Sequence, residues 1–123
     1  MPYTLELPDS ELRDVAREGA LVRVRLSAAA ARNDAGERGW LTSVTLQIAQ
    51  ATLAGDATHA FGKIIEGALR HGGDVVALTP PDALQGAIEL SLRLANGTQF
   101  ALHGDRLAAT LADDARFTAD LSC

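Results

Sequence analysis

The sequence predicts an all-β fold of about seven or eight mainly antiparallel strands. From Ile88 to Leu94, apolar residues alternate with polar ones, which is the period of a strand with one dry face and one wet face. Asn96-Gly97 follows, and both residues tolerate the positive φ of a tight hairpin turn. From residue 20 onward, short apolar runs are separated by Gly, Pro, Asn and Asp. We therefore expect a small barrel or a folded-over sandwich with at most one short helix.

The predicted strands follow one another with turn residues between them. The longest candidate runs from Trp40 to Leu53, and its two ends fall on opposite faces, which indicates a bulge or bend near Ala49 to Ala51. Turns are expected at Gly72-Gly73, Gly104-Asp105 and Asp113-Asp114, and Pro80-Pro81 ends a strand. The expected strands are 21–30, 40–53, 62–70 (with Ile65, Gly67 and Leu69 on one side), 74–79, 86–94, 100–102, 106–112 and 117–121.

The segment from Asp9 to Glu18 supports two interpretations. Asp9 or Ser10 is suited to capping a helix, apolar residues follow at helical spacing, and Gly19 is placed to end it. The alternative is a first strand from Glu11 to Arg17 that forms a hairpin with the strand at 21–30.

Composition limits the classes of function. The 123 residues predict a single domain, 1–123, with a core of aliphatic side chains because only 4% of residues are aromatic. A net charge of −5, with scattered Arg and one Lys, argues against nucleic-acid binding and against docking on anionic membranes. One cysteine, Cys123, cannot form an internal disulfide, and no leader or membrane span is recognised, so we expect a cytoplasmic protein. No cofactor or metal is needed to explain folding.

Several short matches resemble a group of small bacterial proteins of unassigned function. They are Asp9-Ser10-Glu, a strand ending in Leu-Ser-Ala, Gly39-Trp40-Leu, Gly67-Ala-Leu, Pro80 and Leu-Ala-Asn-Gly, which together cover most of the chain. The resemblance implies that residues 9–17 form a strand, and it implies no activity.

The histidines are the side chains that titrate near neutral pH without help. His71 and His103 each precede Gly and Asp, a pattern typical of turns, and a strand count places these two at opposite ends of the sheet. The same count leaves His59, His103 and Asp105 as the one grouping suited to acid–base chemistry or metal binding. This grouping is the basis of an alternative function as a small hydrolase or isomerase.

Trp40 is the remaining candidate. It shares a strand face with Val44 and Leu46, which predicts a core position; the alternative is that it lines a pocket mouth or an oligomer contact. Nucleotide-loop, zinc and nucleophile-elbow motifs are not found in the sequence. We therefore expect a non-enzymatic binding or interaction module whose partner is another protein or a second copy. A small-ligand carrier with an open barrel interior is a further alternative.

Overall fold

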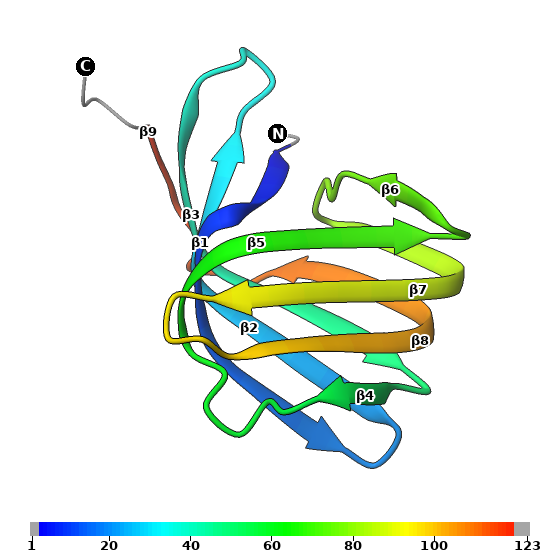
Figure 1. Cartoon of the computed structure of the whole chain (residues 1–123). Helices are drawn as coiled ribbons and strands as arrows, with labels where there is room; N and C mark the ends of the chain where they lie inside the picture. The colour runs from blue at the N-terminus through cyan, green and yellow to red at the C-terminus, as the bar shows by residue number, and fades with distance from the viewer. Residues whose placement is uncertain (1–2, 120–123) are drawn as a thin grey trace.

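The computed structural model describes residues 3–119, and these residues form strands and loops with no helix (Figure 1). Cys123 and the last two residues of the predicted strand 117–121 lie outside the described residues. Within residues 3–119 the nine strands are β1 (Thr4–Glu18), β2 (Leu21–Arg32), β3 (Arg38–Ala49), β4 (Thr52–Gly55), β5 (Gly62–His71), β6 (Asp74–Val76), β7 (Asp82–Leu94), β8 (Gln99–Leu111) and β9 (Phe117–Ala119).

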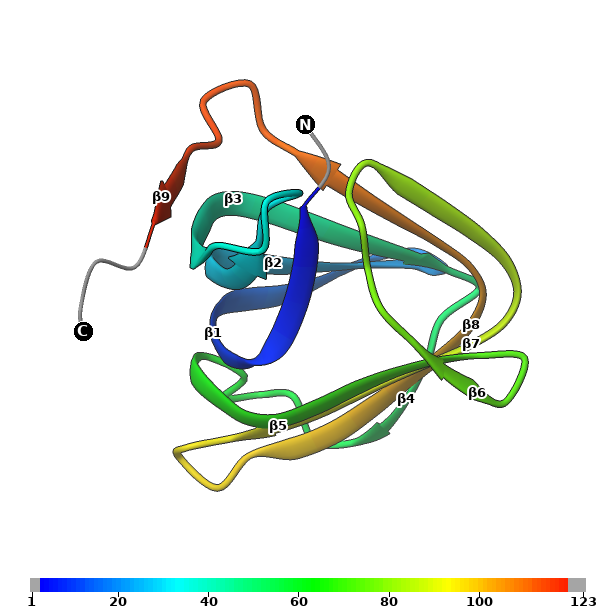
Figure 2. The same cartoon turned by 90° about the horizontal axis from the view of Figure 1, so that it is seen from above.

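The strands pair antiparallel and close into a six-stranded barrel with three short strands added. Around the barrel the order is β1-β2-β3-β8-β7-β5, and β5 returns to β1. The closing contact is narrow, since β1 and β5 pair only at Glu11 with Lys63 and at Leu12 with Gly62. Figure 2 shows β1, β2 and β3 forming one wall, and β5 and β4 in the opposite wall. The predicted small β-barrel is therefore confirmed.

The segment at residues 9–18 is strand, so the helix suggested by its capping residues is wrong. β1 forms the alternative hairpin with β2, in which Val15 pairs with Val24. A helix of this length would have left β2 without a partner on that edge. The hairpin instead places Leu12 and Leu26 side by side in the core, where each is at most 2% exposed.

One corner of the barrel is made by glycine. β8 pairs with β4 up to His103 and with β3 from Arg106 onward, and Gly104 lies between the two regions. A Cβ at Gly104 would lie 2.4 Å from Ile48 Cγ2 and 2.6 Å from the Ala49 carbonyl oxygen. Gly104 therefore marks a close approach of two backbones within one continuous strand. The predicted turn at Gly104-Asp105 is wrong for this reason.

A second corner is made by residues other than glycine. Asp9 in β1 has φ of 72° and Ser43 in β3 has φ of 59°. In β1 the buried positions change from Leu5 and Leu7 to Ser10 and Leu12, so the phase of the alternation shifts at Asp9. In β3 the buried residue before Ser43 is Leu41, and the next is Val44. We call this bend of β1, β2 and β3 the polar corner.

The polar corner explains why Trp40 is not in the core. Because the phase shifts at Ser43, Trp40 faces outward and is 37% exposed, whereas Val44 is 1% exposed. The prediction that the two share a buried face is wrong. The predicted bend after Ala49 is confirmed, since Gln50 has φ of 53° and separates β3 from β4. A similar irregularity in β5 turns Ile65 outward and Ile64 inward, so the prediction that Ile65 lies on the same side as Leu69 is wrong.

The barrel interior is filled by aliphatic side chains from all six barrel strands. The largest of those with less than 2% exposure are Leu12, Leu26, Leu41, Leu46, Ile48, Ile64, Leu69, Leu90, Leu92, Leu94, Leu102 and Leu107. Side chains so fully covered have packed neighbours on every side. The surface available for binding is therefore the outside of the barrel.

Candidate functional site

A pocket of about 580 Å³ lies on the outer surface at the polar corner. It is lined by Asp9, Glu11, Ala28, Arg38, Trp40 and Lys63. These residues come from β1, β2, β3 and β5, so four strands build the pocket. We call it the Trp40 pocket.

Strand register places the walls of the Trp40 pocket. Glu11 pairs with Ala28 on one side and with Lys63 on the other, so β2, β1 and β5 contribute neighbouring side chains. Trp40 in β3 pairs with Ala30, which lies two residues beyond Ala28 in β2. Ala28 is small, and its position between Glu11 and the Trp40 region leaves the surface hollow. The pocket therefore depends on the narrow β1–β5 contact as well as on the polar corner.

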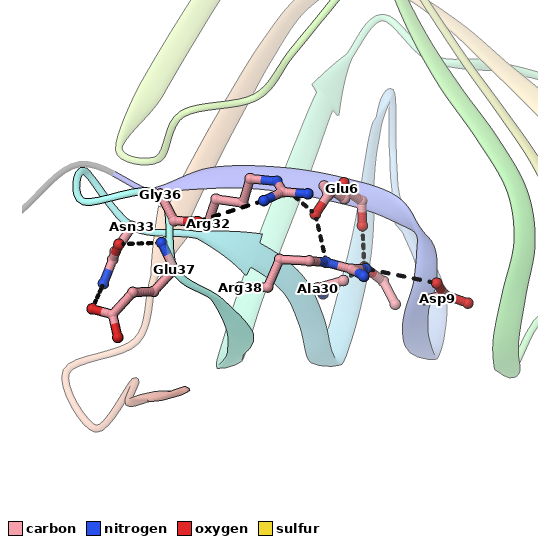
Figure 3. Close-up of polar contacts among 9 residues, drawn as sticks. Glu6, Asp9, Ala30, Arg32, Asn33, Gly36, Glu37 and Arg38 are labelled. Carbon is pink, nitrogen blue, oxygen red and sulfur yellow. Dashed lines mark hydrogen bonds and ion pairs between the residues drawn. The ribbon is translucent and has the colours of Figure 1, made fainter. Parts of the chain in front are cut away.

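Ion pairs connect the strands beside the pocket (Figure 3). Arg38 Nε lies 3.2 Å from Glu6 Oε1, and Arg38 Nη2 lies 3.8 Å from Asp9 Oδ2. Lys63 Nζ lies 3.5 Å from the other Asp9 oxygen, and Arg32 Nε lies 3.5 Å from Glu6 Oε1. All of these groups are at least one-third exposed, so each pair contributes at most about 1 kcal/mol to stability. Their effect is to hold the charged heads around the rim.

Ser10 holds the polar corner from inside. Its hydroxyl donates to the Glu6 carbonyl at 2.6 Å and accepts from the Ala30 N–H at 2.9 Å. Among residues 3–119, Ser10 is the one polar residue that is buried, and its exposure is 0%. The bulge at Asp9 interrupts the ladder between β1 and β2, and the hydroxyl supplies the bonds that the ladder lacks there.

The loop between β2 and β3 is ordered by one side chain. Asn33 Oδ1 accepts from the N–H groups of Ala35 and Glu37, at 3.0 and 2.9 Å, and Asn33 Nδ2 donates to the Glu37 carboxylate at 3.0 Å (Figure 3). This arrangement of an Asn side chain around its own backbone is common in tight turns. It fixes the start of β3, and therefore the position of Arg38.

The predicted grouping of His59, His103 and Asp105 is not brought together as a metal site. Within residues 3–119, no group of three or more His, Cys, Asp or Glu side chains is arranged to hold a metal ion. His103 Nε2 lies 3.1 Å from Glu89 Oε2 on the neighbouring strand. Asp105 is exposed on β8, in the continuous strand where the turn was expected.

His59 lies in the loop between β4 and β5. Its carbonyl accepts from Asn96 Nδ2 at 2.9 Å and from Thr98 Oγ1 at 3.2 Å, so the loop is attached to the β7–β8 turn. Hydrogen bonds from the Thr58 hydroxyl and N–H lower the pKa of Asp56 at the start of this loop. These contacts organise the backbone of the loop and leave the imidazole exposed.

Glu89 also accepts a hydrogen bond from Ser91 Oγ, at 3.3 Å. Ser91, Glu89 and His103 therefore form a chain of hydrogen bonds in which the carboxylate lies between the serine and the histidine. A nucleophilic serine needs an imidazole as its immediate base, with the carboxylate behind the imidazole. Here the carboxylate separates the two, so this arrangement does not activate the hydroxyl.

A larger hollow of about 770 Å³ lies across β4, β8, β7 and β5. Ala54, Ala101, Ser91 and Ala68 are paired in a row across these strands, and small side chains make the surface hollow. Arg93 and Glu66 at its rim form an ion pair with each other. A binding site needs a few convergent groups that orient a ligand, and an aromatic side chain strengthens it. Phe100 lines this hollow but is 3% exposed, whereas Trp40 is 37% exposed, so the Trp40 pocket meets these requirements better.

Comparison with family models, with curated proteins and with solved structures finds no match for this chain. The residues that the structure describes contain no helix that is long and apolar enough to cross a membrane. The resemblance to small bacterial proteins stays a prediction.

Sequence reasoning identified one member of the Trp40 pocket, Trp40 itself, as lining a pocket mouth in the second of its two interpretations. The sequence indicates Asp9 as a helix cap and as part of the resemblance, and it does not mark Glu11, Arg38 or Lys63 as site residues. A signal was present, because Leu5 and Leu7 are odd-numbered whereas Leu12 is even-numbered. That change of parity indicates a bulge between them, and charged residues beside a bulge are candidates for a site.

Proposed function

We propose that this protein is a non-enzymatic binding module of the bacterial cytoplasm and that the Trp40 pocket is its binding site. The observation that supports this most is the position of the one tryptophan of the chain. Trp40 is 37% exposed in a pocket that also holds four charged side chains. Tryptophan is enriched among residues that dominate binding energy, because it offers a large contact area with few rotatable bonds.

The rigidity of the surroundings supports the same proposal. The pocket side chains lie on or beside paired strands, and ion pairs hold Arg38 and Lys63 toward Asp9. A site whose groups are already in place loses less conformational entropy when a partner binds.

The alternative functions have less support. A carrier would need space inside the barrel, and the interior positions are filled by side chains with almost no accessible surface. A hydrolase or isomerase would need His59, His103 and Asp105 to act together, and His103 is instead hydrogen-bonded to Glu89. Binding at the outer surface requires neither space inside the barrel nor the joint action of those three residues.

The experiment uses Trp40 as its own reporter, since the chain has one tryptophan. Wild-type protein is titrated with a library of metabolites, saccharides and peptides while the emission of Trp40 is recorded, and hits are measured by calorimetry. We expect hits whose affinity falls at least tenfold in Trp40→Ser. The matched control is Val75→Ser on β6, which removes another exposed apolar side chain away from the pocket.

A library in which nothing perturbs Trp40, or in which Trp40→Ser binds as well as wild type, would reject the proposal. Light scattering on wild type and Trp40→Ser tests whether the partner is a second copy. A dimer that is lost only in the Trp40 variant would identify the pocket as a self-association surface.

A further inference from the structure

We infer that the Trp40 pocket binds an uncharged saccharide, one or two sugar rings in size. This inference rests on the proposed function and adds the chemical class of the ligand. A pocket of about 580 Å³ is within the usual range for small-molecule sites, roughly 300 to 1,000 Å³.

The charges in the pocket favour an uncharged ligand. Two carboxylates, Asp9 and Glu11, line it together with two cations, Arg38 and Lys63. Asp9 lies between the cations, 3.8 Å from Arg38 and 3.5 Å from Lys63. A cationic ligand would approach Arg38 and Lys63, and an anionic ligand would approach Asp9 and Glu11. Either one meets like charges at short range, which costs affinity.

Hydrogen-bond chemistry points to hydroxyl groups. Ionised carboxylates only accept hydrogen bonds, whereas the Lys ammonium and Arg guanidinium only donate them. A hydroxyl does both, so neighbouring hydroxyls of one ring can donate to Glu11 and accept from Lys63 at the same time. Glu11 and Lys63 are directly paired across β1 and β5, which places one acceptor and one donor side by side. Charge-assisted hydrogen bonds of this kind are the stronger class.

The apolar part of the lining has one aromatic member. Trp40 and Ala28 provide it, and the other four lining residues are charged. A sugar ring likewise combines apolar and polar surface, because its C–H groups form apolar patches and its hydroxyls surround them. Packing C–H groups on an indole removes apolar area from water on both partners. A nucleobase is flat and apolar on both faces and is better suited to stacking between two aromatic side chains.

The test uses the full chain and three sets of probes. They are uncharged mono- and disaccharides, a Lys-rich and a Glu-rich peptide, and the nucleosides adenosine and uridine. Binding is followed by Trp40 emission and by calorimetry at low and high salt. We expect at least one saccharide to bind with a Kd that changes less than about twofold between 0.05 and 0.5 M salt, because screening acts on charged ligands.

Variants locate the contacts. Glu11→Gln and Lys63→Met are each expected to weaken saccharide binding about three- to tenfold, and Trp40→Ser is expected to weaken it at least tenfold. Val75→Ser serves as the unaffected control, and thermal unfolding confirms that each variant is folded.

The possible outcomes separate this inference from the proposed function. Binding of a peptide or a nucleoside but of no saccharide at 10 mM, with loss in Trp40→Ser, would overturn the saccharide class and leave the binding site. Saccharide binding that is unchanged in Glu11→Gln, Lys63→Met and Trp40→Ser would overturn the inference as well. If no probe binds, both the saccharide inference and the proposed binding site are overturned.

Discussion

Two corners of the barrel, one at Gly104 and one at Asp9 and Ser43, are built by different chemistry. At Gly104 in β8 the chain bends because the missing side chain lets the Ile48 and Ala49 region of β3 approach. At Asp9 and Ser43 the bend uses positive φ values of 72° and 59° in residues that carry side chains. The first corner brings two backbones into close contact. The second leaves polar side chains on the outer surface, and the Trp40 pocket lies there. A bend made without glycine can therefore also form a site.

The largest effect is expected from filling the glycine corner. Gly104→Ala places a methyl group 2.6 Å from the Ala49 carbonyl oxygen, so backbone must move. We expect a loss of about 2 to 3 kcal/mol in the free energy of unfolding, measured with urea. Gly72→Asn is the matched control, because its φ of 61° suits Asn and no atom lies within 4 Å of the added Cβ. Equal losses in the two variants would show that close approach is not what Gly104 provides.

The polar corner is expected to depend on Ser10. Ser10→Ala removes the hydroxyl that joins the Glu6 carbonyl to the Ala30 N–H and leaves both groups buried without that partner. The expected cost is about 2 kcal/mol in urea unfolding. Ser27→Ala is the control, since Ser27 is exposed and its contacts with Glu11 are 3.4 Å long. We expect that control to lose less than about 0.5 kcal/mol.

These two corners also show what the sequence could reveal about the fold. The hairpin at Asn96-Gly97 was predicted correctly because turn residues act locally, although its turn is longer than the predicted one and only Gly97 has a positive φ, at 91°. Gly104 was misassigned as a turn because a glycine can serve either a turn or a close approach, and the approaching strand lies more than 50 residues earlier in the chain. Only the register between β3 and β8 distinguishes the two uses.

The candidate site was less predictable for the same kind of reason. Trp40 was placed in the core because the alternation seen at Val44 and Leu46 was extended back through Ser43. The positive φ of Ser43 breaks that alternation, and Ser is an uncommon residue at such an angle. Lys63 reaches the pocket only through two residue pairs between β1 and β5, which no local pattern encodes.

A smaller effect of opposite sign is expected at Ser43. Its left-handed backbone costs about 1 kcal/mol for a residue with a Cβ, whereas the entropy lost by a glycine is about 0.5 kcal/mol. Ser43→Gly should therefore raise the free energy of unfolding by about 0.5 kcal/mol. Ser27→Gly, at the paired level of β2 and without positive φ, should lower it by about the same amount. Destabilisation by both changes would mean that the Ser43 side chain itself supports the corner.

The smallest effect is expected from the carboxylate of Asp14. Asp14 in β1 accepts from Arg25 Nε at 2.7 Å, and this hydrogen bond lowers the pKa of Asp14. A carboxyl whose pKa is lowered by folding stabilises the fold above about pH 4, and the contribution is lost as pH falls through the folded-state pKa. Both side chains are more than one-third exposed, so solvent screening keeps this contribution small.

Asp14→Asn should therefore lower the urea midpoint at pH 7, and the difference from wild type should shrink when the same measurement is made near pH 2.5. Asp105→Asn provides the comparison at the glycine corner, because Asp105 is exposed and forms no ion pair among residues 3–119. It should change the midpoint little at either pH. A pH-independent loss in Asp14→Asn would show that the residue acts through packing and not through its charge.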